Sequence, residues 1–320
     1  MSSGTTVSER GAESSAHASV EGDGYVPLKE RFRAWWNGND STGTTHLRRA
    51  TASLAIEHSG TDDEPPWSPA RIRAIEAVWG TGFLLPGGGR FARKLLAVLA
   101  VSSKKSVLDL TADLGGTARA LANQHNLWMD AFEPIERLAT EGHRRSVIEG
   151  LAKRVPVTAI NFDTFELPPR RYDAIYSRER LFTVSNKDRV LDQCVIGLKD
   201  RGQVLLTDFM LPERIISTRT DTSLRRTGET PHLWTMRQYR AAFEARGLLV
   251  RLANDLSSDY LQLMHDAWSK APEAIRRERM SRRQVDLIME EGGMWLARSR
   301  AMRDGKLVLG RIHAQLDKVE

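Results

Sequence analysis

Residues 107–116, VLDLTADLGG, restrict the fold of this chain more than any other segment. An apolar run ends at Asp109, and Gly115 and Gly116 precede a stretch whose spacing favours a helix. In a βαβ unit, glycines after the first strand let the backbone approach a bound nucleotide, and an acidic residue about 20 residues further on holds the ribose hydroxyls. Glu133 lies 24 residues after Asp109, where the next predicted strand ends. The segment therefore predicts the start of a nucleotide-binding α/β fold.

The chain around this segment alternates between predicted strands and predicted helices. Such alternation is typical of a parallel sheet with right-handed crossovers. The predicted strands are residues 106–110, 127–132, 157–161, 172–177, 203–208, 248–254 and 306–314. The predicted helices among them are residues 90–100, 116–123, 136–154, 187–199 and 235–246. We therefore expect an α/β, Rossmann-like, doubly wound and mostly parallel sheet of about seven strands.

The chain is predicted to divide into a tail, a helical cap and a main domain. Residues 1–24 are rich in Ser, Gly, Thr, Glu and Ala without apolar periodicity, which predicts a disordered tail. Residues 25–89 form the cap and lid, and residues 90–320 form the main domain. Within that domain, residues 259–303 are predicted to be a long helical insertion. The predicted cap helices are residues 25–38 and 68–79.

The helical insertion carries a run of arginines, in a chain whose net charge is +6. These residues are Arg276, Arg277, Arg279, Arg282 and Arg283. Such a run is either a solvated helix face or a contact with an anionic surface or partner. Nucleic acid is not an expected partner, because no aromatic residues alternate with the arginines and no separate binding module accompanies them. The sequence makes no prediction of an oligomeric state.

The composition argues against several other classes of protein. Cys194 is the only cysteine, which excludes an internal disulfide, and its apolar surroundings are typical of a buried helix. The eight histidines form no pair at the spacing of helical metal ligands, so we expect no metal. No apolar run is long enough to span a bilayer, and no secretory or transit signal is visible. A cytoplasmic protein without a transmembrane segment is expected.

Four segments follow one another in the order of a known family. They are residues 107–116 with Glu133, INFDTFELP at 160–168, YDAIYSRERLFTV at 172–184 and LKDRGQVLLTDFML at 198–211. In these segments the chain resembles the class I S-adenosylmethionine-dependent methyltransferases. The resemblance implies a Rossmann-like fold with S-adenosylmethionine as the cofactor.

The same resemblance implies roles for single residues. Asp109 contacts the methionine end of the cofactor, Glu133 holds the ribose hydroxyls, and Asp163 faces the adenine amino group. Phe162 or Phe165 flanks the adenine ring.

A narrower resemblance involves WGTGFLLPGGG at 79–89 and YSRERL at 176–181. Both segments are similar to the phosphoethanolamine and related small-amine methyltransferases. In that family the first segment folds over the methionine part of the cofactor. By turn chemistry alone, the same segment is equally well explained as a glycine-rich turn between two helices. The lid residues implied are Phe83, Leu84, Leu85, Gly87 and Gly88.

The turn departs from the family pattern of three alternating glycines. Thr111 and Asp113 take the first two glycine positions, and only Gly115 remains. A β-branched residue is strained at positive φ, whereas aspartate tolerates the left-handed region better. Either the turn has ordinary dihedral angles at Thr111, or the cofactor approaches it less closely. Asp113 could also reach the positively charged sulfonium or amino end of the ligand.

Methyl transfer from a sulfonium mainly requires that donor and acceptor be aligned and water excluded. A general base helps where the acceptor must lose a proton, and Glu179 or His232 is the candidate. A purely structural role is the alternative for each. The resemblance also implies that Tyr176 and Arg178 shape the acceptor pocket, and ordinary packing or an ion pair is the alternative for each.

Two functions therefore remain. The first is an S-adenosylmethionine-dependent methyltransferase acting on nitrogen or oxygen of a small or lipid-derived acceptor. Here the cap helices and the polar segment 212–231 would close over the site. The second is a catalytically degenerate protein that keeps the fold as a binding or assembly module, which the two missing glycines favour.

Overall fold

The computed structural model describes residues 66–213 and 230–317. The chain separates into two compact units, Met1–Asn39 and Asp40–Glu320, and all described residues belong to the second. The predicted tail, the predicted helix at 25–38 and most of the polar segment 212–231 lie outside the described residues.

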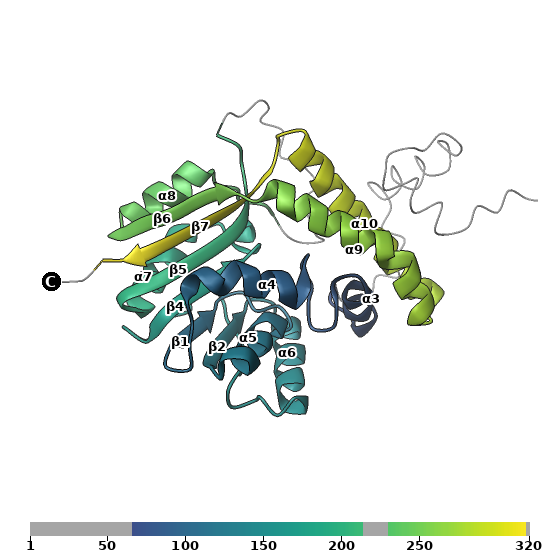
Figure 1. Cartoon of the computed structure of the whole chain (residues 1–320), viewed down its shortest axis with the longest axis horizontal. Coiled ribbons are helices and arrows are strands. Elements are labelled where there is room, and N and C mark those ends of the chain that lie inside the picture. The colour runs from purple at the N-terminus through teal and green to yellow at the C-terminus, as the bar shows by residue number, and fades with distance from the viewer. Residues whose placement is uncertain (1–65, 214–229, 318–320) are drawn as a thin grey trace, which may run out of the picture. The chain divides into compact units, whose positions relative to one another are not determined.

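The described residues form a seven-stranded sheet with the order β3-β2-β1-β4-β5-β7-β6 (Figure 1). Strands β1 to β5 pair in parallel, and β7 is antiparallel to both of its neighbours. The predicted Rossmann-like, mostly parallel sheet is confirmed. Its strands are β1 (Ser106–Asp109), β2 (Trp128–Glu133), β3 (Val157–Ala159), β4 (Tyr172–Arg178), β5 (Leu198–Met210), β6 (Leu248–Asp255) and β7 (Val308–Leu316).

The strand order reverses direction between β1 and β4. The chain runs outward from β1 to β3, then returns to the other side of β1 to form β4. In open α/β sheets such a reversal leaves a crevice at the carboxyl ends of the two strands, and ligands bind there. Asp109 ends β1 and Arg178 ends β4, so both lie at this crevice.

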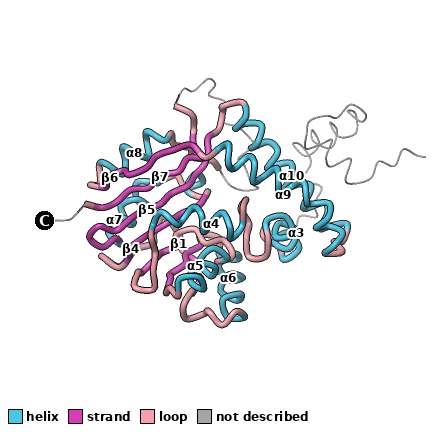
Figure 2. The backbone as a smooth tube through the Cα atoms, viewed as in Figure 1, coloured by secondary structure: helices cyan, strands magenta, loops and turns pink. Residues whose placement is uncertain are grey.

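Helices cover both faces of the sheet (Figures 1 and 2), with α4, α5 and α6 on one face and α7 and α8 on the other. The helices are α3 (Pro69–Trp79), α4 (Gly88–Leu96), α5 (Gly116–His125), α6 (Glu136–Ile148), α7 (Lys187–Gly197), α8 (Met236–Glu244), α9 (Ser257–Arg277) and α10 (Arg282–Arg303). Short 3-10 turns occur at Ala97–Leu99 and Leu181–Thr183.

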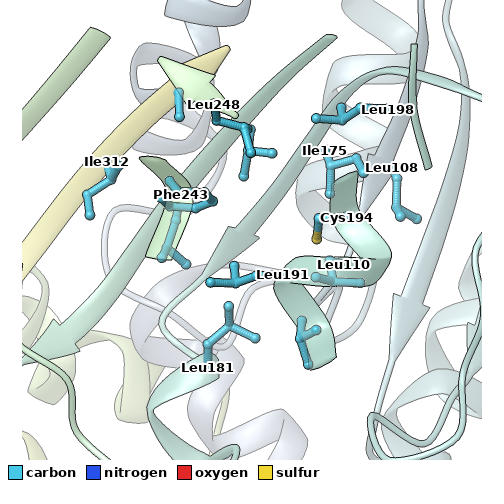
Figure 3. Packing of buried hydrophobic residues seen from close by; sticks show 14 of the residues in the cluster. Leu108, Leu110, Ile175, Leu181, Leu191, Cys194, Leu198, Phe243, Leu248 and Ile312 are labelled. Carbon is cyan, nitrogen blue, oxygen red and sulfur yellow. The ribbon is translucent and has the colours of Figure 1, made fainter. Parts of the chain in front are cut away.

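The core on the α7 and α8 face consists of apolar side chains from alternate strand positions (Figure 3). Leu108 of β1 and Ile175 of β4 pack there with Leu191 and Cys194 of α7 and Phe243 of α8. Burial raises the pKa of the Cys194 thiol to about 12. The thiol is therefore an inert core group, as its apolar surroundings predicted.

The predicted helical insertion contains two helices, α9 and α10. Arg279 has a φ of +49°, and Ser281 begins α10 with a capping box closed by Gln284. The two helices pack against α3, where the Trp79 ring makes edge contacts with Trp268 at 5.7 Å and Trp295 at 5.3 Å. These contacts join the insertion to the segment that precedes the candidate site.

The surface of the insertion bears the arginines noted in the sequence. Arg277 pairs with Glu278, and Arg283 lies 3.9 Å from Glu290. Their exposure agrees with a solvated face, and a contact with an anionic surface stays a prediction. Among the described residues, no helix is long and apolar enough to cross a membrane.

Candidate active site

A pocket lies at the carboxyl ends of β1 and β4, where the strand order reverses. Three parts of the chain line it: the segment between α3 and α4, the stretch from the end of β1 to the first turn of α5, and the last residue of β4. The lining residues are Gly82, Phe83, Leu84, Leu85, Asp109, Thr111, Ala112, Asp113, Thr117 and Arg178. Most of them were predicted from the sequence, and the pocket brings them together. Gly82, Ala112 and Thr117 were not singled out, although each lies inside or beside a motif that was.

The turn between β1 and α5 accommodates its two missing glycines in different ways. Thr111 does not have a positive φ, and its hydroxyl accepts a hydrogen bond from the backbone N–H of Arg178 at 2.9 Å. Asp113 has a φ of +50° and Gly115 a φ of +73°. Of the two sequence-based alternatives, ordinary dihedral angles at Thr111 are what the structure contains. Asp113 takes the left-handed conformation, which aspartate adopts at lower cost than most residues.

Asp109 is a buried carboxylic acid that faces the pocket. The Tyr176 hydroxyl donates a hydrogen bond to its Oδ2 at 2.6 Å, and the Thr111 N–H lies 3.3 Å from its Oδ1. Burial raises the pKa of Asp109 to about 7, against these two donors, which lower it. Tyr176, predicted for the acceptor pocket, is 1% exposed and orients Asp109 rather than lining the pocket.

Glu133 ends β2 directly behind the turn and is completely buried. Its two carboxylate oxygens accept hydrogen bonds from the backbone N–H groups of Asp113 at 2.8 Å and Ile135 at 2.9 Å. Burial raises its pKa to about 8, while the positive charge of Arg180 acts in the opposite direction. Arg180 also pairs with Asp113, with 3.3 Å between Nη2 and Oδ1.

The segment between α3 and α4 lies against the first turn of α5. A Cβ atom on Gly116 would meet the backbone carbonyl group of Gly82, so glycine at this position permits the contact. The Gly82 N–H donates to Glu76 Oε1 at 2.5 Å, and Glu76 in turn pairs with Arg145 of α6. The segment is thus a turn between two helices that also covers the pocket. Its contact with a cofactor stays a prediction.

The end of the segment between α3 and α4 is held by Arg178 of β4 and by the backbone conformation of Gly87, which precedes α4. Arg178 is 4% exposed and donates to the carbonyl oxygen of Pro86 at 3.3 Å. Its guanidinium lies 5.5 Å from the centre of the Phe91 ring. Gly87 precedes α4 with a φ of +84°, and a Cβ there would clash with Phe91. Gly87 therefore shapes the segment and does not line the pocket.

The residues predicted to hold the adenine ring do not line the pocket. Phe162 and Phe165 are buried and make an edge contact with each other at 5.7 Å, within the apolar core. Asp163 between them is exposed, and its N–H donates to Asn161 Oδ1 at 2.9 Å. Their role toward an adenine ring stays a prediction.

The two candidate bases have different surroundings. Glu179 is buried with a φ of +41°, and its carboxylate accepts from the Thr207 hydroxyl at 2.6 Å and the Tyr260 hydroxyl at 3.3 Å. Burial raises its pKa, although the adjacent Arg178 lowers it. His232 is exposed, and its backbone N–H donates to Phe182. Neither residue lines the pocket.

Asp109→Asn is expected to stabilise the cofactor-free protein at pH 8. Between the unfolded pKa near 4 and the folded pKa of about 7, the folded state holds more protons than the unfolded state. This carboxyl therefore makes stability fall by up to about 1.4 kcal/mol per pH unit as the pH rises through that window. Asparagine cannot ionise and keeps an acceptor for Thr111.

Urea unfolding of both proteins at pH 4 and pH 8 checks this expectation. The difference in free energy of unfolding between Asp109→Asn and the parent protein should shrink toward pH 4. Asp130→Asn serves as the control, because Asp130 accepts a similar tyrosine hydrogen bond, from Tyr172 at 2.7 Å, at a partly exposed position. Equal pH dependence in Asp109→Asn and the parent protein would contradict the expectation.

A family model described as a methyltransferase domain matches residues 87–253. A phosphoethanolamine N-methyltransferase of Plasmodium falciparum is 26% identical over 151 residues, which cover 45% of this chain and 53% of that protein. A sarcosine/dimethylglycine N-methyltransferase of Aphanothece halophytica is 30% identical over 105 residues, covering 32% of this chain and 38% of that protein. The chain thus spans about half or less of these curated relatives.

Solved structures show the same fold at low sequence identity. Phosphoethanolamine N-methyltransferase 2 of Haemonchus contortus, in complex with phosphomonomethylethanolamine and S-adenosylhomocysteine, is 18% identical with a TM-score of 0.69. The similarity covers 80% of this chain and 60% of that one. Geranyl diphosphate C-methyltransferase of Streptomyces coelicolor A3(2) is 16% identical with a TM-score of 0.60, covering 92% and 99% of the two chains.

Proposed function

The chain belongs to the methyltransferase-domain family, and from this premise we propose that it transfers a methyl group from S-adenosylmethionine to the nitrogen of a small amine. The observation that carries the proposal is the pocket at the strand reversal, where Asp109, Asp113 and the segment around Gly82 converge. The narrower choice of a small amine is supported by the N-methyltransferase names of the curated relatives.

The residues at the pocket suit the chemistry of this cofactor. Asp109 offers a carboxylate to a ligand whose sulfonium and amino groups are positively charged. Glu133 lies behind the turn and does not line the pocket, but each of its carboxylate oxygens accepts one backbone hydrogen bond and keeps a lone pair for a ribose hydroxyl. The cofactor, when bound, supplies a methyl group already activated on sulfur. The segment around Gly82 excludes water from the pocket.

We assign the acceptor side to residues at the end of β4. Arg178 lines the pocket with a buried guanidinium, which suits a phosphate or carboxylate on the acceptor. Glu179 follows it, and burial raises the pKa of its carboxyl, which suits a group that accepts a proton from the amine. Exposed His232 is the less favoured base.

Cofactor binding is expected to strengthen as the pH rises from 6 to 9. Glu133 and Asp109 must be ionised to bind ribose hydroxyls and a cationic ligand, and their pKa values are about 8 and about 7. Each proton released on binding adds up to about tenfold in affinity per pH unit below the pKa. Calorimetric titration with S-adenosylmethionine and S-adenosylhomocysteine, in buffers of different ionisation enthalpy, measures affinity and proton release together.

The same protein should form S-adenosylhomocysteine when an acceptor is added. Phosphoethanolamine, sarcosine and geranyl diphosphate form a panel that separates a small amine from a lipid-derived acceptor. Turnover with geranyl diphosphate alone would overturn the choice of a small amine. If neither cofactor form binds at any pH, the chain is a binding or assembly module that keeps only the fold.

A further inference from the structure

Asp113 occupies the position of the family's second turn glycine and contacts two other charged residues, Glu133 and Arg180. Its N–H is bound by Glu133, and its carboxylate lies 3.3 Å from the guanidinium of Arg180. Glu133 ends β2, Asp113 follows β1, and Arg180 follows β4. These two contacts therefore connect residues at the carboxyl ends of the three adjacent strands β2, β1 and β4 at the strand reversal.

The contact between Asp113 and Arg180 is largely removed from water. Their side chains are 14% and 10% exposed, so salt screens this pair less than an ion pair on the surface. Breaking a pair of this kind by removing one partner leaves the other charge buried and uncompensated. The two residues are therefore expected to depend on each other.

Asp113 adds a negative charge near Glu133 that a glycine at this position would not add. It brings a second carboxylate beside buried Glu133, and like charges disfavour each other's ionised form. The charged groups around Glu133 are Asp113, which raises its pKa, and Arg180, which lowers it. Asp113 also interacts electrostatically with Asp109 and Arg178, and it raises the pKa of both. The guanidinium of Arg180 thus offsets the charge that Asp113 adds.

We propose that Arg180 is a positioning residue of the cofactor site, which with Asp113 forms an ion pair that replaces the second glycine and holds the turn in place against Glu133. The glycine turn of the family relies on conformational freedom, whereas this turn relies on paired charge. The effect on cofactor binding rests on the proposed function. The effect on the cofactor-free protein does not.

A double-mutant cycle of Asp113→Gly, Arg180→Met and both together tests the pair. The readouts are the unfolding midpoint of the cofactor-free protein and the affinity for S-adenosylhomocysteine at pH 6, 7, 8 and 9. Arg240→Met is the matched control, because Arg240 pairs with Glu244 at an exposed position of α8.

Arg180→Met is expected to weaken S-adenosylhomocysteine binding by about tenfold at pH 7, because loss of the guanidinium raises the pKa of Glu133 further and leaves less of this carboxyl ionised. The loss should shrink at pH 9, where more of the Glu133 carboxyl is ionised, and a merely structural role would not produce this pH dependence. The double variant has a glycine at position 113 and lacks both charges of the ion pair. Its affinity for S-adenosylhomocysteine should therefore return to within about threefold of that of the parent protein. Its unfolding midpoint should also lie above that of Arg180→Met.

Two results would overturn the inference. One is tighter binding by Arg180→Met, which would mean that Arg180 blocks the site. The other is additive losses in the double variant, in both unfolding and binding. If the parent protein binds no cofactor at all, the proposed function fails, and the unfolding cycle still decides whether Asp113 and Arg180 are coupled.

Discussion

Gly116→Ala is expected to weaken binding of S-adenosylhomocysteine by about 5- to 150-fold, the range that overpacking by 1–3 kcal/mol produces. A Cβ at this position would meet the carbonyl oxygen and carbon of Gly82. Both atoms belong to the backbone, so no rotamer change relieves the contact. The segment that lines the pocket with Gly82 and Leu84 must therefore move away from α5.

The substitution isolates this close approach from backbone strain. Gly116 does not have a positive φ, and alanine is by about 1 kcal/mol the better helix former in a helix interior. Gly293→Ala in α10 is the matched control, because a Cβ there meets nothing within 4 Å. It should bind normally and unfold no more readily than the parent protein. Calorimetry and urea unfolding measure both variants, and equal affinity in the two would contradict the expectation.

Glu133→Gln is expected to weaken binding of both cofactor forms by about 100-fold or more, because charge-assisted hydrogen bonds of about 1.5–3 kcal/mol are lost. The carboxylate accepts from two backbone N–H groups, those of Asp113 and Ile135. A glutamine amide offers one oxygen, so its NH2 group must face the other donor. The turn is then displaced, and the charge that favours ribose hydroxyls is gone.

The pH dependence of binding provides a second readout for this variant. The part of the rise in affinity between pH 7 and 9 that comes from the Glu133 carboxyl, whose pKa is about 8, should disappear. Glu136→Gln makes the same change three residues away, in the first turn of α6, and should retain both affinity and pH profile. Unchanged binding by Glu133→Gln would remove this residue from the cofactor site.

Local patterns were sufficient to predict most elements of the fold. Short apolar runs at residues 106–110 and 172–177, within an order of alternating strands and helices, predicted β1 and β4. The helical insertion expected at residues 259–303 contains α9 and α10, with a break between them. Its break depends on Arg279 at positive φ and on the cap at Ser281, which periodicity alone does not separate from a continuous helix.

The candidate site was only partly predictable. The sequence grouped Asp109, Thr111 and Asp113 because they are neighbours in the chain, and the pocket contains all three. It did not connect Asp113 with Arg180, which lies 67 residues away. It also could not show that Tyr176 is turned toward Asp109 and away from the pocket, since that depends on the register between β1 and β4.

The sequence by itself determined the strand, turn and helix at residues 107–116 and the acid at Glu133, because these depend on local spacing. It also revealed the loss of two glycines. Only the tertiary structure decided how the turn tolerates that loss: Thr111 bonds to β4, and Asp113 is held between Glu133 and Arg180. The physical reason is that strand order brings together residues from distant parts of the chain, and a buried charge is stable only beside its partner.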